Sequence, residues 1–108
     1  MIISQKENIT ILTQERASIS ELVKKINNHY PKMKNDNIVL NLTPLKELSI
    51  YEIIEFIQIS NTHRAGKHSF VIVNNSIDID ETPDELIVVP TLQEAFDIIE
   101  MEEMERDL

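Results

Sequence analysis

Three short, continuously apolar runs alternate along this chain with longer amphipathic segments, and this alternation restricts the fold. The runs occupy residues 38–42 (Ile-Val-Leu-Asn-Leu), 70–73 and 86–89. Strands this short and this apolar are typical of parallel sheets that are covered on both faces. Because parallel neighbours need crossover connections, the pattern predicts right-handed βαβ units and an α/β fold. Residues expected to be buried in central strands are Val39, Leu40, Val71, Ile72, Ile87 and Val88.

Three helices are predicted by the same start signal, a hydroxyl residue followed three positions later by glutamate. These capping boxes fall at residues 18–21, 49–52 and 91–94. Gly66 is expected to end the middle helix, with His63 and Arg64 in its last turn. Apolar stripes at helical spacing follow each signal: Ile19, Leu22, Val23 and Ile26; Ile50, Ile53, Ile54 and Ile57; Leu92, Ala95, Phe96 and Ile99.

The two ends of the pattern complete the expected topology. Residues 1–4 and 9–13 flank a polar stretch and predict a hairpin. Residues 74–85 are too few for a crossover helix, although Pro83 favours one helical turn starting at residues 82–85. The order β-β-α-β-α-β-(short)-β-α predicts a mixed, mostly parallel sheet of four to five strands with packed helices. At 108 residues the chain is one domain, 1–108, that ends in an acidic helix, 91–108.

Composition argues against most catalytic and cofactor sites. The single glycine, Gly66, excludes a P-loop, a dinucleotide-binding fingerprint and a nucleophile elbow, each of which needs at least two. The chain has no cysteine, as is usual in a reducing compartment, so a cytoplasmic location is expected. His63 and His68 are five residues apart, not the three or four of a helical metal site. We therefore expect no enzymatic activity, no metal and no cofactor.

Charge is strongly segregated along the chain. Residues 77–108 contain twelve acidic residues and one basic residue, a balance of −11, whereas residues 1–76 have a balance of about +2. A nucleic-acid binder needs a basic stripe, and an acidic third is repelled by nucleic acids and by anionic membranes. The segment is interpreted either as a solubilising face or as a docking surface for a basic partner.

A second apolar stripe lies on the last helix. At about 100° per residue, Ile98, Met101, Met104 and Leu108 fall almost opposite the core-facing stripe. One interpretation is that the helix frays after Glu100 and that its tail is disordered. The other is that the stripe binds a second chain, either a copy of this protein or another protein. Glutamates expected to flank this contact are Glu100, Glu102, Glu103 and Glu105.

Two stretches, 37–64 and 86–99, resemble the STAS domain, the fold of bacterial anti-sigma factor antagonists and of the cytoplasmic tails of sulfate transporters. The first resembles it through the strand 38–42, which runs into Leu45 and Leu48, and through the helix from Ser49. The second, Val-Pro-Thr-Leu-Gln-Glu-Ala-Phe at residues 89–96, is similar to the family's last strand and its T-x-x-E-A helix start. The element order matches over nearly the whole chain. The resemblance implies that the helix from Ser49 and its adjoining loops form a partner-binding face.

The chain departs from phospho-switched STAS proteins at the switch itself. Their Asp-Ser-Ser-Gly loop aligns with residues 49–52, which places Tyr51 at the phosphoacceptor position and Glu52 at the glycine. The resemblance therefore implies a small bacterial interaction module that binds a protein through Ser49, Tyr51 and Glu52, and the departures imply that it is not phosphorylated on serine at the usual position. Alternatives are an acidic decoy of a nucleic-acid-binding surface, or a structural accessory subunit of a larger enzyme such as an RNA-processing nuclease.

Overall fold

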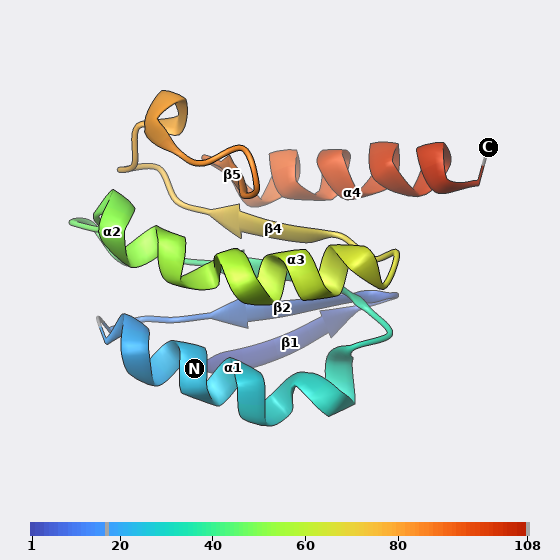
Figure 1. The fold of residues 1–108 in the computed structure, drawn as a ribbon, viewed down its shortest axis with the longest axis horizontal. Helices are drawn as coiled ribbons and strands as arrows, with labels where there is room; N and C mark the ends of the chain where they lie inside the picture. The colour runs from blue at the N-terminus through green and yellow to red at the C-terminus, as the bar shows by residue number, and fades with distance from the viewer. Residues whose placement is uncertain (17, 108) are drawn as a thin grey trace.

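The computed structural model describes residues 1–16 and 18–107 and has the expected α/β architecture (Figure 1). Its five strands form one sheet in the order β1-β2-β3-β4-β5, with β1 and β2 antiparallel and the remaining neighbours parallel. The elements are β1 (Ile2–Lys6), β2 (Ile9–Thr13), α1 (Ile19–Met33), β3 (Asn37–Asn41), α2 (Ile50–Ile53), the 3-10 turn η1 (Ile54–Phe56), α3 (Ile57–Ala65), β4 (Phe70–Val73), the 3-10 turn η2 (Ile79–Glu81), β5 (Ile87–Val89) and α4 (Leu92–Arg106).

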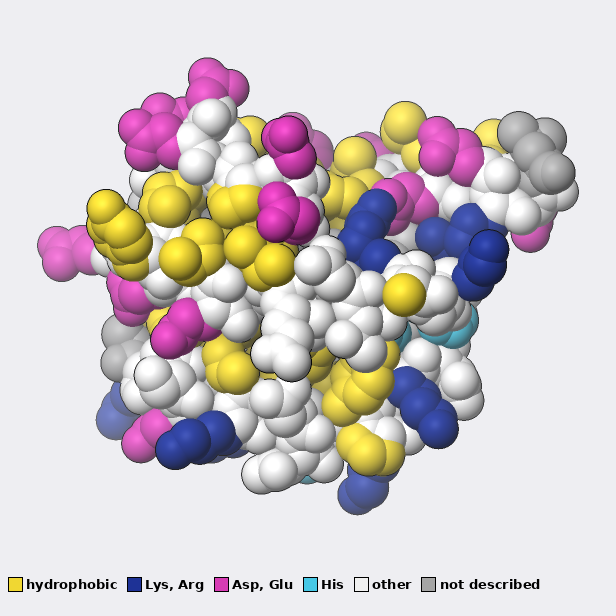
Figure 2. Space-filling view, viewed as in Figure 1, with side chains coloured by type: hydrophobic (Ala, Val, Ile, Leu, Met, Phe, Trp, Pro, Cys, Tyr) yellow, Lys and Arg dark blue, Asp and Glu magenta, His cyan; other side chains and the backbone are white. Residues whose placement is uncertain are grey.

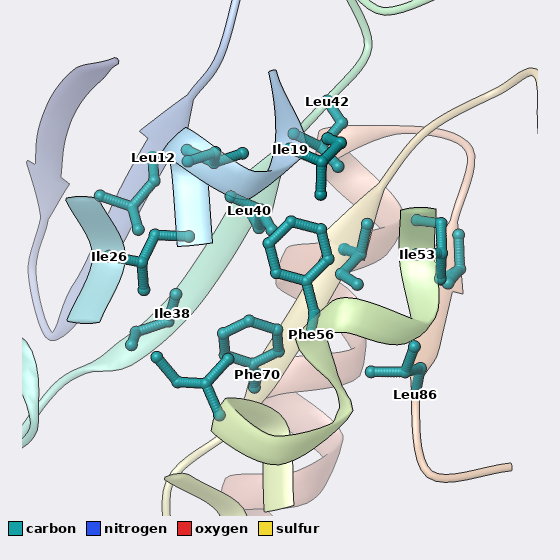
Figure 3. Close-up of a cluster of buried hydrophobic side chains, with 14 of the residues drawn as sticks. Leu12, Ile19, Ile26, Ile38, Leu40, Leu42, Ile53, Phe56, Phe70 and Leu86 are labelled. Atoms are coloured by element: carbon teal, nitrogen blue, oxygen red, sulfur yellow. The ribbon is translucent and has the colours of Figure 1, made fainter. Parts of the chain in front are cut away.

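Helices cover both faces of the sheet. Figure 1 shows α1 and α3 across the near face, and α4 packs on the opposite face. The larger core lies under α1, α2 and α3, with Phe56 and Phe70 at its centre (Figure 3). Val39, Val71 and Val73 pack under Ala95 and Ile99 of α4 in the smaller core. Every residue of β3 and β4 is buried, which explains their continuous apolar runs.

One of the strands expected to be central lies at an edge. β5 forms the end of the sheet opposite β1, so Ile87 is only half-buried, whereas the other five residues expected in central strands are buried. Sequence did not distinguish this edge because Leu86 and Val88 are buried under the helices of the larger core. The expected hairpin is confirmed as β1–β2. Within residues 1–16 and 18–107, no helix has the length and apolarity to cross a membrane.

The sequence predicts one turn from residues 82–85, and the chain there makes a single turn, in which the Leu86 amide donates to the Pro83 carbonyl oxygen at 3.0 Å. The 3-10 turn η2, which the sequence did not predict, comes earlier, at Ile79–Glu81. The Asp78 side chain accepts a hydrogen bond from the Asp80 amide at 3.0 Å and caps the turn. At its end, the Thr82 hydroxyl donates to the carbonyl oxygen of Ile79 at 2.7 Å.

The three predicted capping boxes form to different extents. At Ser49 the box is complete: its hydroxyl accepts from the Glu52 amide at 3.2 Å, and the Glu52 carboxylate accepts from the Ser49 amide at 3.1 Å. Thr91 makes only the first of these bonds, to the Glu94 amide. Ser18 has the extended backbone of a cap but makes no side-chain capping bond, so the prediction there is wrong.

The middle helix is interrupted, and this changes which residues it buries. The tighter η1 turn has about three residues per turn, so the buried positions run Ile53, Phe56, Ile59. Ile54, expected in the core stripe, is therefore 40% exposed. The helix ends at Ala65 with Gly66 as its cap and His63 and Arg64 in its last turn, as the sequence predicts.

Candidate protein-binding surfaces

The three predicted site residues at the start of α2 have different roles. Ser49 and Glu52 are half-buried and bonded to each other in the capping box, where the Ser49 hydroxyl also lies 3.2 Å from the Glu52 carboxylate. Tyr51 points away from the protein and is 82% exposed. The cap therefore fixes the start of the helix, and Tyr51 is the side chain free to contact another molecule.

Tyr51 belongs to an exposed apolar surface, which we call the α2 patch and define as Ile50, Tyr51, Ile54 and Ile57. Ile50 and Ile57 are half-buried beside Tyr51 and the exposed Ile54. Figure 2 shows hydrophobic side chains gathered over α2, with acidic side chains around them. Glu47 and Glu55 are exposed in this part of the chain. A regular helix would have turned Ile54 inward, so the sequence pattern did not predict its exposure.

A hollow of about 340 Å³ adjoins the start of α2. Three carboxylates line it, those of Glu15, Glu47 and Glu52, together with one cation, Lys46. Its remaining lining residues are Pro44, Leu45 and Leu48. The lining of the hollow therefore combines apolar side chains with an excess of negative charge, and it suits a positively charged side chain rather than a phosphate.

The carboxyl edge of the parallel strands, where α/β proteins bind small ligands, is occupied by the protein's own loops. Asn74, which follows β4, donates to the carbonyl oxygens of Leu42 and Leu45 at 2.9 and 3.0 Å. Asn41, at the end of β3, accepts from the Thr43 amide and hydroxyl. Because strand order follows chain order, the sheet has no reversal point at which a ligand crevice would open. Two asparagines ending buried strands were the sequence signal for these loop contacts.

The outer stripe of α4 is exposed on a helix that does not fray. α4 continues to Arg106, so the interpretation of a tail disordered after Glu100 is wrong for the described residues. Met101 and Met104 are 56% and 64% exposed and Ile98 is half-buried. Leu108 lies outside the described residues.

Polar contacts along its inner side hold the last turns of α4. Arg64 forms a 2.8 Å salt bridge with Glu102. The side-chain amide of Asn8 donates to the Glu103 carboxylate at 2.9 Å, and Arg106 donates to the Ser69 hydroxyl at 3.3 Å. Glu102 and Glu103 thus face the protein, and the expectation that they flank the outer stripe is wrong, whereas Glu100 and Glu105 are exposed.

The pKa of Glu102 reflects this environment. Burial alone would raise the pKa of Glu102, but the hydrogen bond from Arg64, the nearby Ser69 hydroxyl and the charges of Arg64 and Arg106 lower it overall. Glu102 is therefore a carboxylate at neutral pH. Its position is structural, because it ties α4 to the end of α3.

His63 is a fully buried histidine that sequence analysis placed only at a helix end. Its Nε2 lies 2.7 Å from the Asp36 carbonyl oxygen and its Nδ1 lies 2.9 Å from the Tyr30 hydroxyl. Since a carbonyl only accepts, Nε2 carries the proton and Nδ1 accepts from Tyr30. Burial lowers the pKa of His63, so the ring is neutral. Both nitrogens are occupied, and the side chain joins α1 to α3 instead of facing a cavity.

In the described ranges, 1–16 and 18–107, no three histidine or acidic side chains converge as a metal site. No family model matches the chain, and no curated protein matches it. The function is therefore inferred from the chain's own residues.

Proposed function

We propose that this protein is a regulatory, STAS-like interaction module that binds a partner protein through the α2 patch. The observation that carries this proposal is the 82% exposure of Tyr51 among isoleucines on a helix whose start is fixed by a complete capping box. Exposed aromatic side chains on rigid elements are typical anchors of protein interfaces. The five-stranded mixed sheet and the place of α2 after β3 support the STAS-like assignment.

The partner surface should be apolar at its centre and basic at its edge. The chain has a net charge of −9, and the hollow beside the patch is lined by three carboxylates. Like-charged surfaces would be repelled, whereas a lysine or arginine of the partner fits this hollow.

Binding is expected to be constitutive or to be set by the abundance of the protein. The Ser49 hydroxyl is bonded within the cap, where a phosphate would be repelled by the Glu52 carboxylate. Tyr51, at the usual phosphoacceptor position, is no substrate for a serine kinase. Intact-mass analysis of the protein from growing cells should show no phosphorylated form mapped to residues 49–51, and a stoichiometric phosphoprotein there would contradict the proposal.

Partner capture tests the α2 patch directly. Wild type, Tyr51→Lys and the control Ile79→Lys are used to capture partners from native lysate, and captured proteins are identified by mass spectrometry. Ile79 is an exposed isoleucine outside the patch, at 45% exposure, so its variant adds the same charge elsewhere. We expect one basic partner to be retained by wild type and Ile79→Lys and lost with Tyr51→Lys. Equal capture by all three would refute the proposal.

The second candidate function is an acidic decoy, favoured by the exposure of Met101 and Met104 on the acidic helix α4. A decoy would contact a nucleic-acid-binding protein through this outer face. Loss of capture with Met101→Lys plus Met104→Lys, but not with Tyr51→Lys, would favour it. Such a complex should also weaken steeply with salt. Capture of a nuclease subunit through either surface would instead favour the accessory-subunit alternative.

A further inference from the structure

One edge of the sheet is a free strand. In the part of the chain that the structure describes, β1 pairs only with β2, and all five of its residues are exposed. Alternate residues of such a strand direct their amide and carbonyl groups away from the sheet, which leaves a row of unpaired backbone groups. Proteins usually protect such an edge with proline, bulges or inward-pointing charges. Here the sequence is Ile-Ile-Ser-Gln-Lys, with no proline and a single charge.

That single charge does not block the edge. The Lys6 ammonium lies over the ring of Phe96 on α4, 4.7 Å from its centroid. The cation is thus directed onto the α4 face of the sheet. Between Ile2 and Lys6 the edge presents only uncharged side chains.

Apolar side chains flank this edge on both faces of the sheet. The register pairs Ile2 with Thr13 and Ile3 with Leu12, so the two isoleucines point to opposite faces. Ile2 is 52% exposed and Ile3 is 48% exposed. A strand added here would therefore gain backbone hydrogen bonds and also cover an isoleucine above and below the sheet.

We propose that β1 pairs antiparallel with β1 of a second copy, which joins two sheets into one. An antiparallel strand can pair with itself about a two-fold axis, so the contact is self-complementary and closed. Both α4 helices would then lie on the same face of the joined sheet. This assignment goes beyond the proposed function, because it concerns a surface that includes no residue of the α2 patch.

The charge distribution favours this edge for a second copy. Residues 78–85, which lead directly into β5 at the opposite edge of the sheet, include five acidic side chains and no basic one. The two edges of the sheet are four strand spacings of about 4.8 Å apart, and this total distance is roughly twice the Debye length at physiological salt. A β1–β1 dimer keeps the two β5 edges at its far ends. Pairing through β5 would bring them together, and β5 is only three residues long and is followed by Pro90.

Sedimentation equilibrium of the full chain over a wide concentration range tests the proposal. We expect a monomer–dimer equilibrium that Ile3→Lys weakens at least tenfold, because it places like charges across the two-fold axis. Ile79→Lys, at an equally exposed isoleucine, and Tyr51→Lys, in the α2 patch, should leave dimerisation unchanged. Circular dichroism checks that each variant is folded. A monomer at all concentrations, or a dimer lost with Tyr51→Lys or with the double methionine variant instead, would overturn the proposal.

A second measurement does not depend on a charged variant. The chain has no cysteine, so a single introduced cysteine can form a disulfide only with another chain. Ile3→Cys, Ser4→Cys and Gln5→Cys place it in turn along β1, and Ser20→Cys on the exposed side of α1 is the control. Under mild oxidation, one β1 position should form linked dimers at least tenfold faster than Ser20→Cys, because cross-strand pairs lie close enough to bridge. Equal rates at all four positions would contradict the pairing.

Discussion

At the scale of single residues, His63 belongs to neither candidate binding surface, but its protonation should still affect the stability of the fold. It is completely buried, and its two ring nitrogens are bonded to Tyr30 and to the Asp36 backbone. Its other close neighbours are the rings of His68 and Phe70. Protonation would place a charge beside these groups and would remove the acceptor that the Tyr30 hydroxyl now uses.

The free energy of unfolding should therefore decrease as the pH is lowered through the range where histidine titrates. The unfolded chain binds a proton at His63 near pH 6.5, whereas burial lowers the pKa of the folded form. The stability from the neutral ring is complete above about pH 6.5 and is lost as pH falls towards the lower, folded pKa. Urea unfolding should show a lower midpoint at pH 5.5 than at pH 7.5. His63→Gln should reduce this difference, and an unchanged wild-type midpoint would contradict the assignment.

Val71 gives the sharpest test of the sheet. It is fully buried in β4 and packs in the smaller core under α4. Val71→Asp places an unpaired charge there and should cost about 3 kcal/mol or more. Gln58→Asp, at an exposed position of α3, is the control and should melt close to wild type. Thermal melting followed by circular dichroism measures both, and a shift of only a degree or two for Val71→Asp would mean that β4 is not central.

Single residues also show what the sequence could and could not predict. The burial of Val39, Val71 and Val88 follows from their apolar runs, and the structure confirms it. The burial of His63 depends on Tyr30 and Asp36, which lie 33 and 27 residues away in the chain. No local sequence pattern reveals contacts between residues so far apart in the chain, so the sequence predicted only that His63 lies at the end of a helix.

At the scale of elements, α4 is stabilised differently along its length. Ala95 and Ile99 bury its first half against β3 and β4, whereas its last turns are attached by polar side chains. Helical periodicity predicted the first half well. Periodicity could not predict how the second half of α4 packs. Glutamates on the side of the helix that faces the protein are favourable only because Arg64 and Asn8 lie opposite them.

Arg64→Ala should therefore loosen the end of α4 selectively. Without the guanidinium, the half-buried Glu102 carboxylate loses its ion pair, and the pKa of Glu102 should rise because the hydrogen bond and the charge of Arg64 no longer lower it. We expect a loss of about 1 kcal/mol in global stability. Hydrogen exchange should accelerate at amides 100–106 and stay unchanged in β3. Lys24→Ala removes an exposed charge from α1, on the other face of the sheet, and serves as the control. Equal exchange in both variants would show that the salt bridge does not hold the helix end.

At the scale of the whole molecule, the acidic and basic residues that are separated along the chain are also separated in space. The acidic segment forms η2, β5 and α4, and Figure 2 shows acidic side chains gathered in the upper part of the view, whereas lysines and arginines lie lower down and towards the right. The sequence predicted the segregation along the chain. It did not predict that β5 would form an edge, because that follows from the strand order.

This arrangement should make the isolated protein more stable in salt. Within residues 1–16 and 18–107 the structure shows one ion pair, Arg64–Glu102, so most of the twelve acidic residues of 77–108 repel one another without a paired cation. Net charge of one sign destabilises a compact state, and salt screens it. The melting temperature should rise between 20 mM and 300 mM sodium chloride.

A variant with Asp80→Asn, Glu81→Gln, Asp84→Asn and Glu85→Gln should have a higher melting temperature than wild type at 20 mM salt, and its melting temperature should rise less when salt is added. These four side chains are exposed, and none of them takes part in the turn cap, to which Asp80 contributes only its backbone amide, so the change is mainly one of charge. A melting temperature that falls with salt would show that attraction between the acidic segment and the basic side chains over α1 outweighs the repulsion.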